Sequence, residues 1–204
     1  MKRIRQLLLV ICILMVLSCV SLSSDSTPFS YTHVPMSSEL VQTINIWVDK
    51  NFGEADKDSI SRGIDQWNYA LNGYIRLNIV SLDFDMEPEV LKKVMQYHGW
   101  LFLKISSDSD FISVEQRRTL AFVNSIGGNI IYYIRDRIVN EGMYGITMHE
   151  TGHLLGAYHS PGYLMDPYYS INQYRCVDKG TMVQITSRWH LDMKRINYCE
   201  YGRL

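Results

Sequence analysis

Three histidines and one glutamate lie within eleven residues, in the order His-Glu-x-x-His-x-x-Gly-x-x-His. His149 and His153 are four residues apart, so in a helix both lie on one face and can reach a single metal ion. Glu150 is rotated by one position, which suits it to take a proton from a metal-bound water. A glycine at position 156 can end the helix and let His159 return as a third ligand.

This donor set predicts a catalytic zinc site, because three protein ligands leave the fourth tetrahedral position open for water. A single histidine in a helix is more often an ordinary core or surface residue than a ligand, but the joint spacing of all four residues is rare by chance. We therefore predict that His149, His153 and His159 bind one zinc ion and that Glu150 is the catalytic general base.

A methionine follows the third histidine in the run Tyr-Leu-Met-Asp-Pro, which ends at Pro167. Residues 145–169 resemble the metzincin metalloproteases, in which the extended histidine motif is followed by a Met-turn. Ser160 directly after the third histidine, and the Met-x-Pro-x-Tyr run that begins at Met165, resemble the matrixin branch.

The resemblance implies an α+β fold: a five-stranded twisted mixed sheet with an antiparallel edge strand, an active-site helix, a Met-turn and a C-terminal helix. It implies that Met165 forms an apolar floor beneath the metal and that Pro167 and Tyr169 line the substrate pocket; packing in the core is the alternative for Met165 and for Tyr169. The edge strand would be residues 119–123, including Ala121, and an exposed edge can pair with an extended peptide.

Apolar periodicity along the chain agrees with this order of elements. Helix caps are expected at Asp56 or Asp58 and at Gly73, and a turn is expected at residues 127–128. The predicted strands are residues 41–49, 75–80, 100–105, 120–123 and 130–134, and the predicted helices are residues 56–73, 88–97, 140–156 and 187–196.

Composition limits the classes of protein that fit the chain. Its 204 residues, 47% hydrophobic and 20% charged, fit one globular domain, which we place at residues 39–204. The basic residues form no cluster, so a nucleic-acid partner is not expected. We expect a monomer that acts on a protein or peptide in extended conformation.

The first 18 residues have the character of an export signal. Lys2, Arg3 and Arg5 precede an apolar run over residues 7–17, which is too short for an ordinary membrane span. Val-Leu-Ser-Cys at positions 16–19 resembles a bacterial lipobox, which would make Cys19 the lipidated N-terminus. The lipid anchor would then be the only contact of the protein with the membrane. Ordinary cleavage a few residues later, giving a periplasmic or secreted enzyme, is the alternative. Removal of residues 1–18 changes the net charge from −1 to about −4, because it removes three basic and no acidic residues.

Cysteine usage agrees with an oxidising compartment. Residues 19–38 are rich in Ser, Thr and Pro and are predicted to form a tether. Cys176 and Cys199 remain as an even pair and are predicted to form a disulfide, although two free thiols are the alternative. A second zinc site is not expected, because only His33 and His98 lie upstream. Residues 106–110 could bind calcium, but a solvated polar loop is the simpler interpretation.

The sequence therefore predicts a zinc endopeptidase of the bacterial cell envelope. Two alternatives stay open: an envelope lipoprotein that retains the fold as a binding module without catalysis, and a zinc amide hydrolase that acts on cell-wall peptide. Glu150 argues against the first, because a pure binding module has no use for a carboxylate beside an open zinc ion.

Overall fold

A five-stranded mixed sheet forms the centre of the molecule, with strand order β3-β2-β4-β6-β5. The computed structural model describes residues 29–87, 91, 94, 99–109, 112, 118–139, 142–168 and 175–201. Strands β2, β3, β4 and β6 run parallel, and β5 pairs antiparallel with β6 at one edge. The predicted fold class, α+β with an antiparallel edge strand, is therefore confirmed.

The strands lie close to where apolar periodicity predicts them. β4 is buried along most of its length, as expected for a central parallel strand with both faces covered. β3 is longer than predicted by four residues at its C-terminal end. The strands of the sheet are β2 (Gln42–Asp49), β3 (Ile75–Phe84), β4 (Trp100–Ile105), β5 (Ala121–Val123) and β6 (Ile130–Ile134).

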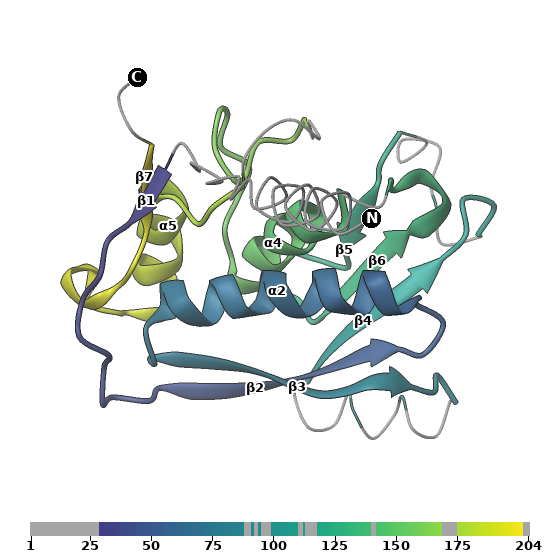
Figure 1. Cartoon of the computed structure of the whole chain (residues 1–204), viewed down its shortest axis with the longest axis horizontal. Coiled ribbons are helices and arrows are strands. Elements are labelled where there is room, and N and C mark those ends of the chain that lie inside the picture. The colour runs from purple at the N-terminus through teal and green to yellow at the C-terminus, as the bar shows by residue number, and fades with distance from the viewer. Residues whose placement is uncertain are drawn as a thin grey trace, which may run out of the picture.

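Two helices, α2 (Glu54–Leu71) and α4 (Gly142–Leu155), lie over the same face of the sheet, as Figure 1 shows. They approach closely because Gly63 of α2 has no side chain; a Cβ there would lie 3.0 Å from Cγ2 of Thr147. Trp67 Nε1 donates a hydrogen bond to the carbonyl of Met148 at 2.9 Å. These contacts hold α4 against α2.

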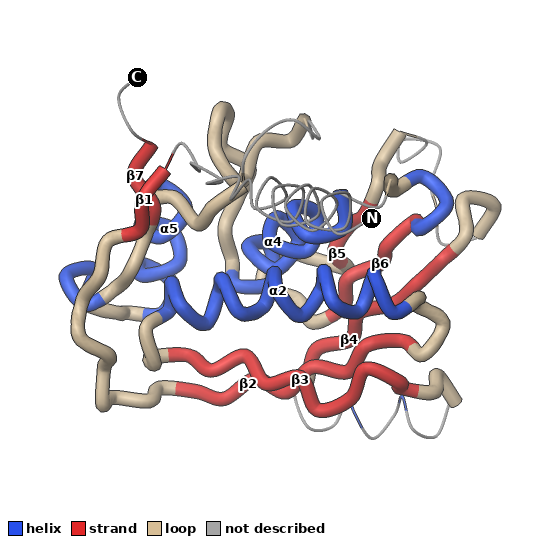
Figure 2. Tube along the Cα trace, viewed as in Figure 1, coloured by secondary structure: helices blue, strands red, loops and turns tan. Residues whose placement is uncertain are grey.

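A smaller C-terminal part packs beside the end of α4 (Figure 2). It contains α5 (Lys179–Trp189), a short 3-10 helix (Met193–Arg195) and a two-stranded antiparallel sheet of β1 (Phe29–Tyr31) and β7 (Cys199–Tyr201). A second 3-10 helix (Arg135–Arg137) follows β6. The predicted disulfide between Cys176 and Cys199 is present and joins β7 to the segment that leads into α5.

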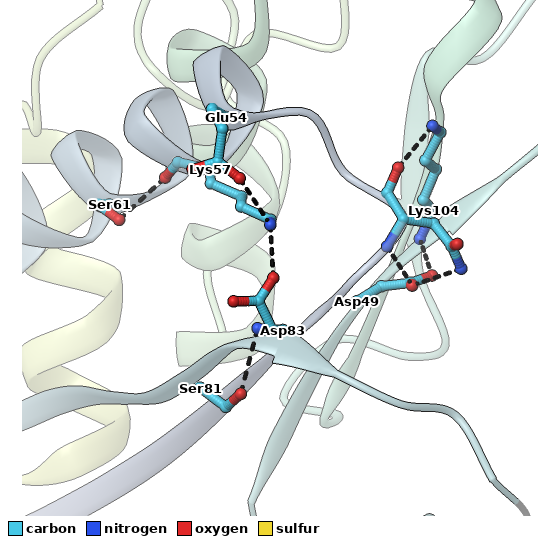
Figure 3. A network of polar contacts seen from close by, with 8 residues as sticks. Asp49, Glu54, Lys57, Ser61, Ser81, Asp83 and Lys104 are labelled. Carbon is cyan, nitrogen blue, oxygen red and sulfur yellow. Dashed lines mark hydrogen bonds and ion pairs between the residues drawn. The ribbon is translucent and has the colours of Figure 1, made fainter.

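Polar side chains connect the N-terminal end of α2 to the sheet (Figure 3). The ammonium of Lys57 lies 2.9 Å from Glu54 Oε1 and 2.6 Å from Asp83 Oδ1, at the end of β3. Asp49, at the end of β2, accepts hydrogen bonds from the backbone N–H groups of Asn51 and Lys104. The ion pair of Lys57 with Asp83 therefore ties α2 to β3, and the bonds of Asp49 join the end of β2 to β4.

Two predictions about the helices are wrong. The last helix spans Lys179–Trp189 rather than residues 187–196, because the Asp178 side chain caps its first turn and His190 ends it in the left-handed conformation. Helix α2 begins after Gly53, while the predicted cap Asp56 is buried and pairs with Arg135 at 2.6 Å.

The tether prediction is wrong for residues 29–34, which are attached to the C-terminal part. β1 pairs with β7, Thr32 N donates to the carbonyl of Tyr198, and Val34 N donates to Asn197 Oδ1. Residues 19–28 lie outside the described residues, as does most of the predicted helix 88–97. Of that helix, Leu91 and Val94 are described, and Val94 is buried against the second face of the sheet. Among the described residues, every helix is too short or too polar for a membrane span.

Candidate metal centre

Helix α4 carries the first two histidines and the glutamate. His153 and Glu150 are buried, and His149 is half-buried. The His149 and His153 rings lie one turn apart, with centroids 4.7 Å from each other. The helix thus presents two imidazoles on one face, as their spacing predicts.

Gly156 reverses the chain after α4. Its φ of +103° lies in the region that glycine adopts without strain, and the N–H of Ala157 donates to the carbonyl of Gly152 at 2.9 Å. The chain then returns His159 to the other two histidines, with its ring centroid 4.7 Å from that of His153. The turn at Gly156 thus brings His159 back to the other two histidines, as the sequence predicts.

The three imidazoles form a cluster that could hold a metal ion, with one ligand nitrogen from each ring and all three within 4.8 Å of one another. His153 Nε2 and His159 Nε2 lie 3.2 Å apart. Two nitrogens bound tetrahedrally to zinc at about 2.0–2.1 Å would be about 3.3–3.4 Å apart. The observed separation therefore fits a shared zinc ion. Among the residues that the structure describes, no other group of three His, Cys, Asp or Glu side chains converges in this way.

Backbone carbonyls set the tautomers of the two helix histidines. His149 Nδ1 donates to the carbonyl of Leu164 and His153 Nδ1 donates to that of Ala157, each at 2.8 Å. With Nδ1 protonated, Nε2 of each ring keeps its lone pair for a metal. Such contacts from outside the ligand set orient metal-binding imidazoles.

Burial also keeps these rings neutral. Desolvation, followed by the neighbouring His153, lowers the pKa of His149 to about 3. Desolvation likewise lowers the pKa of His153. Because only the neutral imidazole binds a metal, both rings are ready for a ligand at neutral pH.

Glu150 lies beside the cluster with its carboxyl group buried. Its Oε2 has no hydrogen-bond partner among the described residues. Desolvation raises the pKa of Glu150 to about 8. A cation nearby favours the charged carboxylate and would lower this pKa again. A buried carboxyl with a free oxygen next to the three imidazoles can exchange a proton with a metal-bound water.

Met165 lies beneath α4 and is fully buried. A Cβ on Gly152 would lie 2.5 Å from its Sδ and 3.3 Å from Cζ2 of Trp67. Glycine at this position therefore lets the methionine approach the helix between the two ligands. This contact places Met165 against α4, and its role as a floor beneath the metal stays a prediction.

The remaining sequence-predicted residues divide into three groups. Ala121 lies on the edge strand β5, but its side chain is buried in the core, so only its backbone could meet a substrate. Pro167 is exposed next to the Met-turn. Tyr169 and Cys19 lie outside the described residues, as does Asp110 of the possible calcium loop; in that loop, Ser106 and Asp108 hydrogen-bond to each other.

Leu164 and Asp178 contribute to the site without having been predicted from sequence. The carbonyl of Leu164 orients His149, and its N–H donates to Asp178 Oδ2 at 3.2 Å. An aspartate three residues before Thr181 is a helix-cap signal, which could have located α5. No local signal could have located Leu164, since its role depends on where the chain returns.

Comparison with known proteins adds little to this geometry. No family model matches the chain, and no curated protein matches it. The crystal structure of metalloproteinase-II from Bacteroides fragilis is similar, with a TM-score of 0.47 and 18% sequence identity over 76% of this chain and 55% of that chain. The chain thus spans about half the length of that metalloproteinase.

Proposed function

We propose that this protein is a zinc-dependent endopeptidase. The convergence of His149, His153 and His159 at metal-binding separation, beside the buried carboxyl of Glu150, carries the proposal. A structural zinc site would use four protein ligands, whereas this cluster offers three and leaves one position for water.

The chemistry divides between the metal and the glutamate. When bound, zinc would acidify a water molecule and polarise the carbonyl of the scissile peptide bond. Glu150 takes a proton from that water as the water oxygen attacks the carbonyl carbon. Glu150 later delivers the proton to the leaving amine nitrogen. The backbone carbonyls that hold His149 and His153 keep their rings fixed while the charge at the site changes.

The edge strand β5 supports an extended peptide as the substrate. In the described residues β5 pairs with β6 alone, so its other edge can accept a further strand. The N–H of Gly127, in the turn between β5 and β6, donates to the carbonyl of His153 at 2.8 Å. This bond ties the edge strand to the ligand helix. We further propose that Pro167 and Tyr169 line the pocket for the residue after the cut.

The decisive experiment replaces Glu150 with glutamine and compares zinc content with peptide cleavage. We expect the variant to retain zinc but to lose at least ~1,000-fold in turnover, since the general base and its charge are lost together. Wild-type digestion of a proteome-derived peptide library, with and without a chelator, gives the reference activity and the cleavage preference. Unchanged cleavage by the variant would refute the mechanism.

The same digest separates the alternatives. A wild-type protein that binds zinc and cleaves no peptide would favour a non-catalytic binding module. Cleavage restricted to cell-wall peptide would favour an amide hydrolase of the envelope. Cleavage of ordinary peptides in extended conformation supports the proposal made here.

We also propose that the protein is exported and anchored by a lipid on Cys19. The basic start, the short apolar run and the lipobox-like residues support this proposal, and so does the disulfide, which persists in oxidising compartments. Intact-mass measurement of the membrane fraction would detect the lipid. Release of a Cys19→Ala variant into the soluble fraction is expected; membrane retention of that variant would contradict it.

A further inference from the structure

The carbonyl oxygen of Leu164 receives two hydrogen bonds from two different segments of the chain. His149 Nδ1 donates to it at 2.8 Å, and Nη1 of Arg175 donates to it at 3.0 Å. A carbonyl oxygen has two lone pairs and can accept both bonds. The guanidinium of Arg175 and the ring of a metal-site histidine therefore meet at one atom.

Arg175 is buried, with 6% of its surface exposed. A buried charge is tolerated only where hydrogen bonds replace its water, and bonds from charged donors are roughly twice as strong as neutral ones. Its bond to Leu164 is therefore a strong restraint on the position of that carbonyl. The arginine comes from neither α4 nor the Met-turn but from the segment that leads into α5.

Leu164 is held at its N–H as well. This N–H donates to Asp178 Oδ2, and the same carboxylate accepts from the N–H of Thr181 at 3.0 Å and from its hydroxyl at 2.6 Å. Asp178 is thus fixed as the cap of α5. Cys176, between the arginine and the aspartate in sequence, is bonded to Cys199. All four residues from 175 to 178 are buried.

We propose that Arg175 is a positioning residue for the metal centre, fixing the Leu164 carbonyl and thereby the tautomer and orientation of the His149 ring. The inference rests on the zinc site of the proposed function, but not on the reaction that occurs there. Arg175 acts through Leu164 and not on the reacting atoms. The disulfide and the cap of α5 hold the arginine's segment in place.

The test measures metal binding in the whole protein, without any peptide. We expect Arg175→Met to bind zinc about 10–100-fold more weakly than the wild type, as is usual when a residue that supports a ligand is lost. We also expect the visible absorption bands of the cobalt-substituted variant to change in position or intensity, because a turned His149 ring alters the ligand geometry around the ion.

Arg135→Met is the matched control. Arg135 is also a largely buried arginine that bonds to a backbone carbonyl, that of Ile138, and it pairs with Asp56 at the far end of α2. This variant should lower the melting temperature but leave zinc affinity and the cobalt spectrum unchanged. An equal loss of zinc affinity in both variants would overturn the inference, since general destabilisation would then explain it.

Wild-type zinc affinity and a wild-type cobalt spectrum in Arg175→Met would also overturn it. If that variant does not fold, Arg175→Lys keeps the charge but lacks the planar fork of donors. A changed cobalt spectrum in the lysine variant supports the inference, and an unchanged one overturns it. A wild-type protein that binds zinc and cleaves no peptide would refute the proposed peptidase while leaving this inference intact.

Discussion

Replacing Gly152 with alanine should disturb both the packing and the metal centre. The new Cβ would meet Met165 Sδ at 2.5 Å, Met165 Cε at 3.2 Å and Trp67 Cζ2 at 3.3 Å. Both neighbours are fully buried, so neither has free space to enter. Overpacking of a core costs about 1–3 kcal/mol, and the better helix propensity of alanine returns about 1 kcal/mol. With three close contacts, we expect a net loss of about 1–2 kcal/mol.

For a domain of this size, that loss lowers the melting temperature by about 2–8 °C. Displacement of Met165 also moves its neighbour Leu164, whose carbonyl holds His149. Zinc affinity should therefore fall together with stability. Denaturant unfolding of the metal-free protein measures the first effect, and a competitive zinc titration measures the second.

Gly63→Ala provides the control, because it places the same methyl group on the neighbouring helix. Its Cβ would meet Thr147 Cγ2 at 3.0 Å, and Met165 is not among its nearest neighbours. We expect this variant to lose stability but to keep its zinc affinity. If Gly152→Ala retained wild-type stability and zinc affinity, the proposed packing of the methionine against α4 would be refuted.

Three further outcomes can be measured directly. Burial raises the folded-state pKa of Glu150 from 4.5 to about 8, so the stability contributed by the protonated carboxyl is fully present below pH 4.5 and is lost as the pH rises through 8. Metal-free Glu150→Gln, which carries no charge, should therefore be more stable than metal-free wild type at pH 8 in urea unfolding. Equal stability of the two proteins at pH 8 would contradict the burial argument. Because the pKa of His149 is lowered to about 3, the metal-free protein should lose stability as the pH falls from about 4.5 toward 3, where Glu150 is protonated in both states and the unfolded chain holds a proton on His149 that the folded ring does not; a flat profile over this range in thermal melts would argue against it. Replacing Cys176 and Cys199 together with serine should cost about 3 kcal/mol for the loop of 23 residues, measured against the oxidised wild type, and wild-type stability of the double variant would contradict this value.

Much of the fold could be predicted from the sequence because its signals are local. Apolar residues alternate in β2, recur at helical spacing in α2 and form a continuous run in β4, while the histidine motif marks α4, each within a single segment. The turn that brings back His159 follows from one glycine, and the metal spacing follows from α-helix geometry. These features need no knowledge of distant parts of the chain.

The parts that could not be predicted depend on contacts between distant residues. The hydrogen bond between Thr32 and Tyr198 joins residues 166 positions apart, and the Ser- and Pro-rich composition of the first segment gives no sign of it. The position of the last helix was predicted wrongly for a different reason. The cap at Asp178 and the left-handed residue His190 decide where it begins and ends. The restraint on Leu164 from Arg175 likewise exists only once the chain has folded back.

The pairing of β1 with β7 has a mechanical consequence. If the N-terminus is attached to a surface, a pulling force enters through β1 and first loads its short antiparallel ladder with β7. β7 carries Cys199, whose covalent bond passes the load to the segment behind the metal centre. We expect the ladder to separate before α4 is strained. In force spectroscopy, the force that detaches the N-terminal segment should be lower than the force that unfolds the rest of the protein.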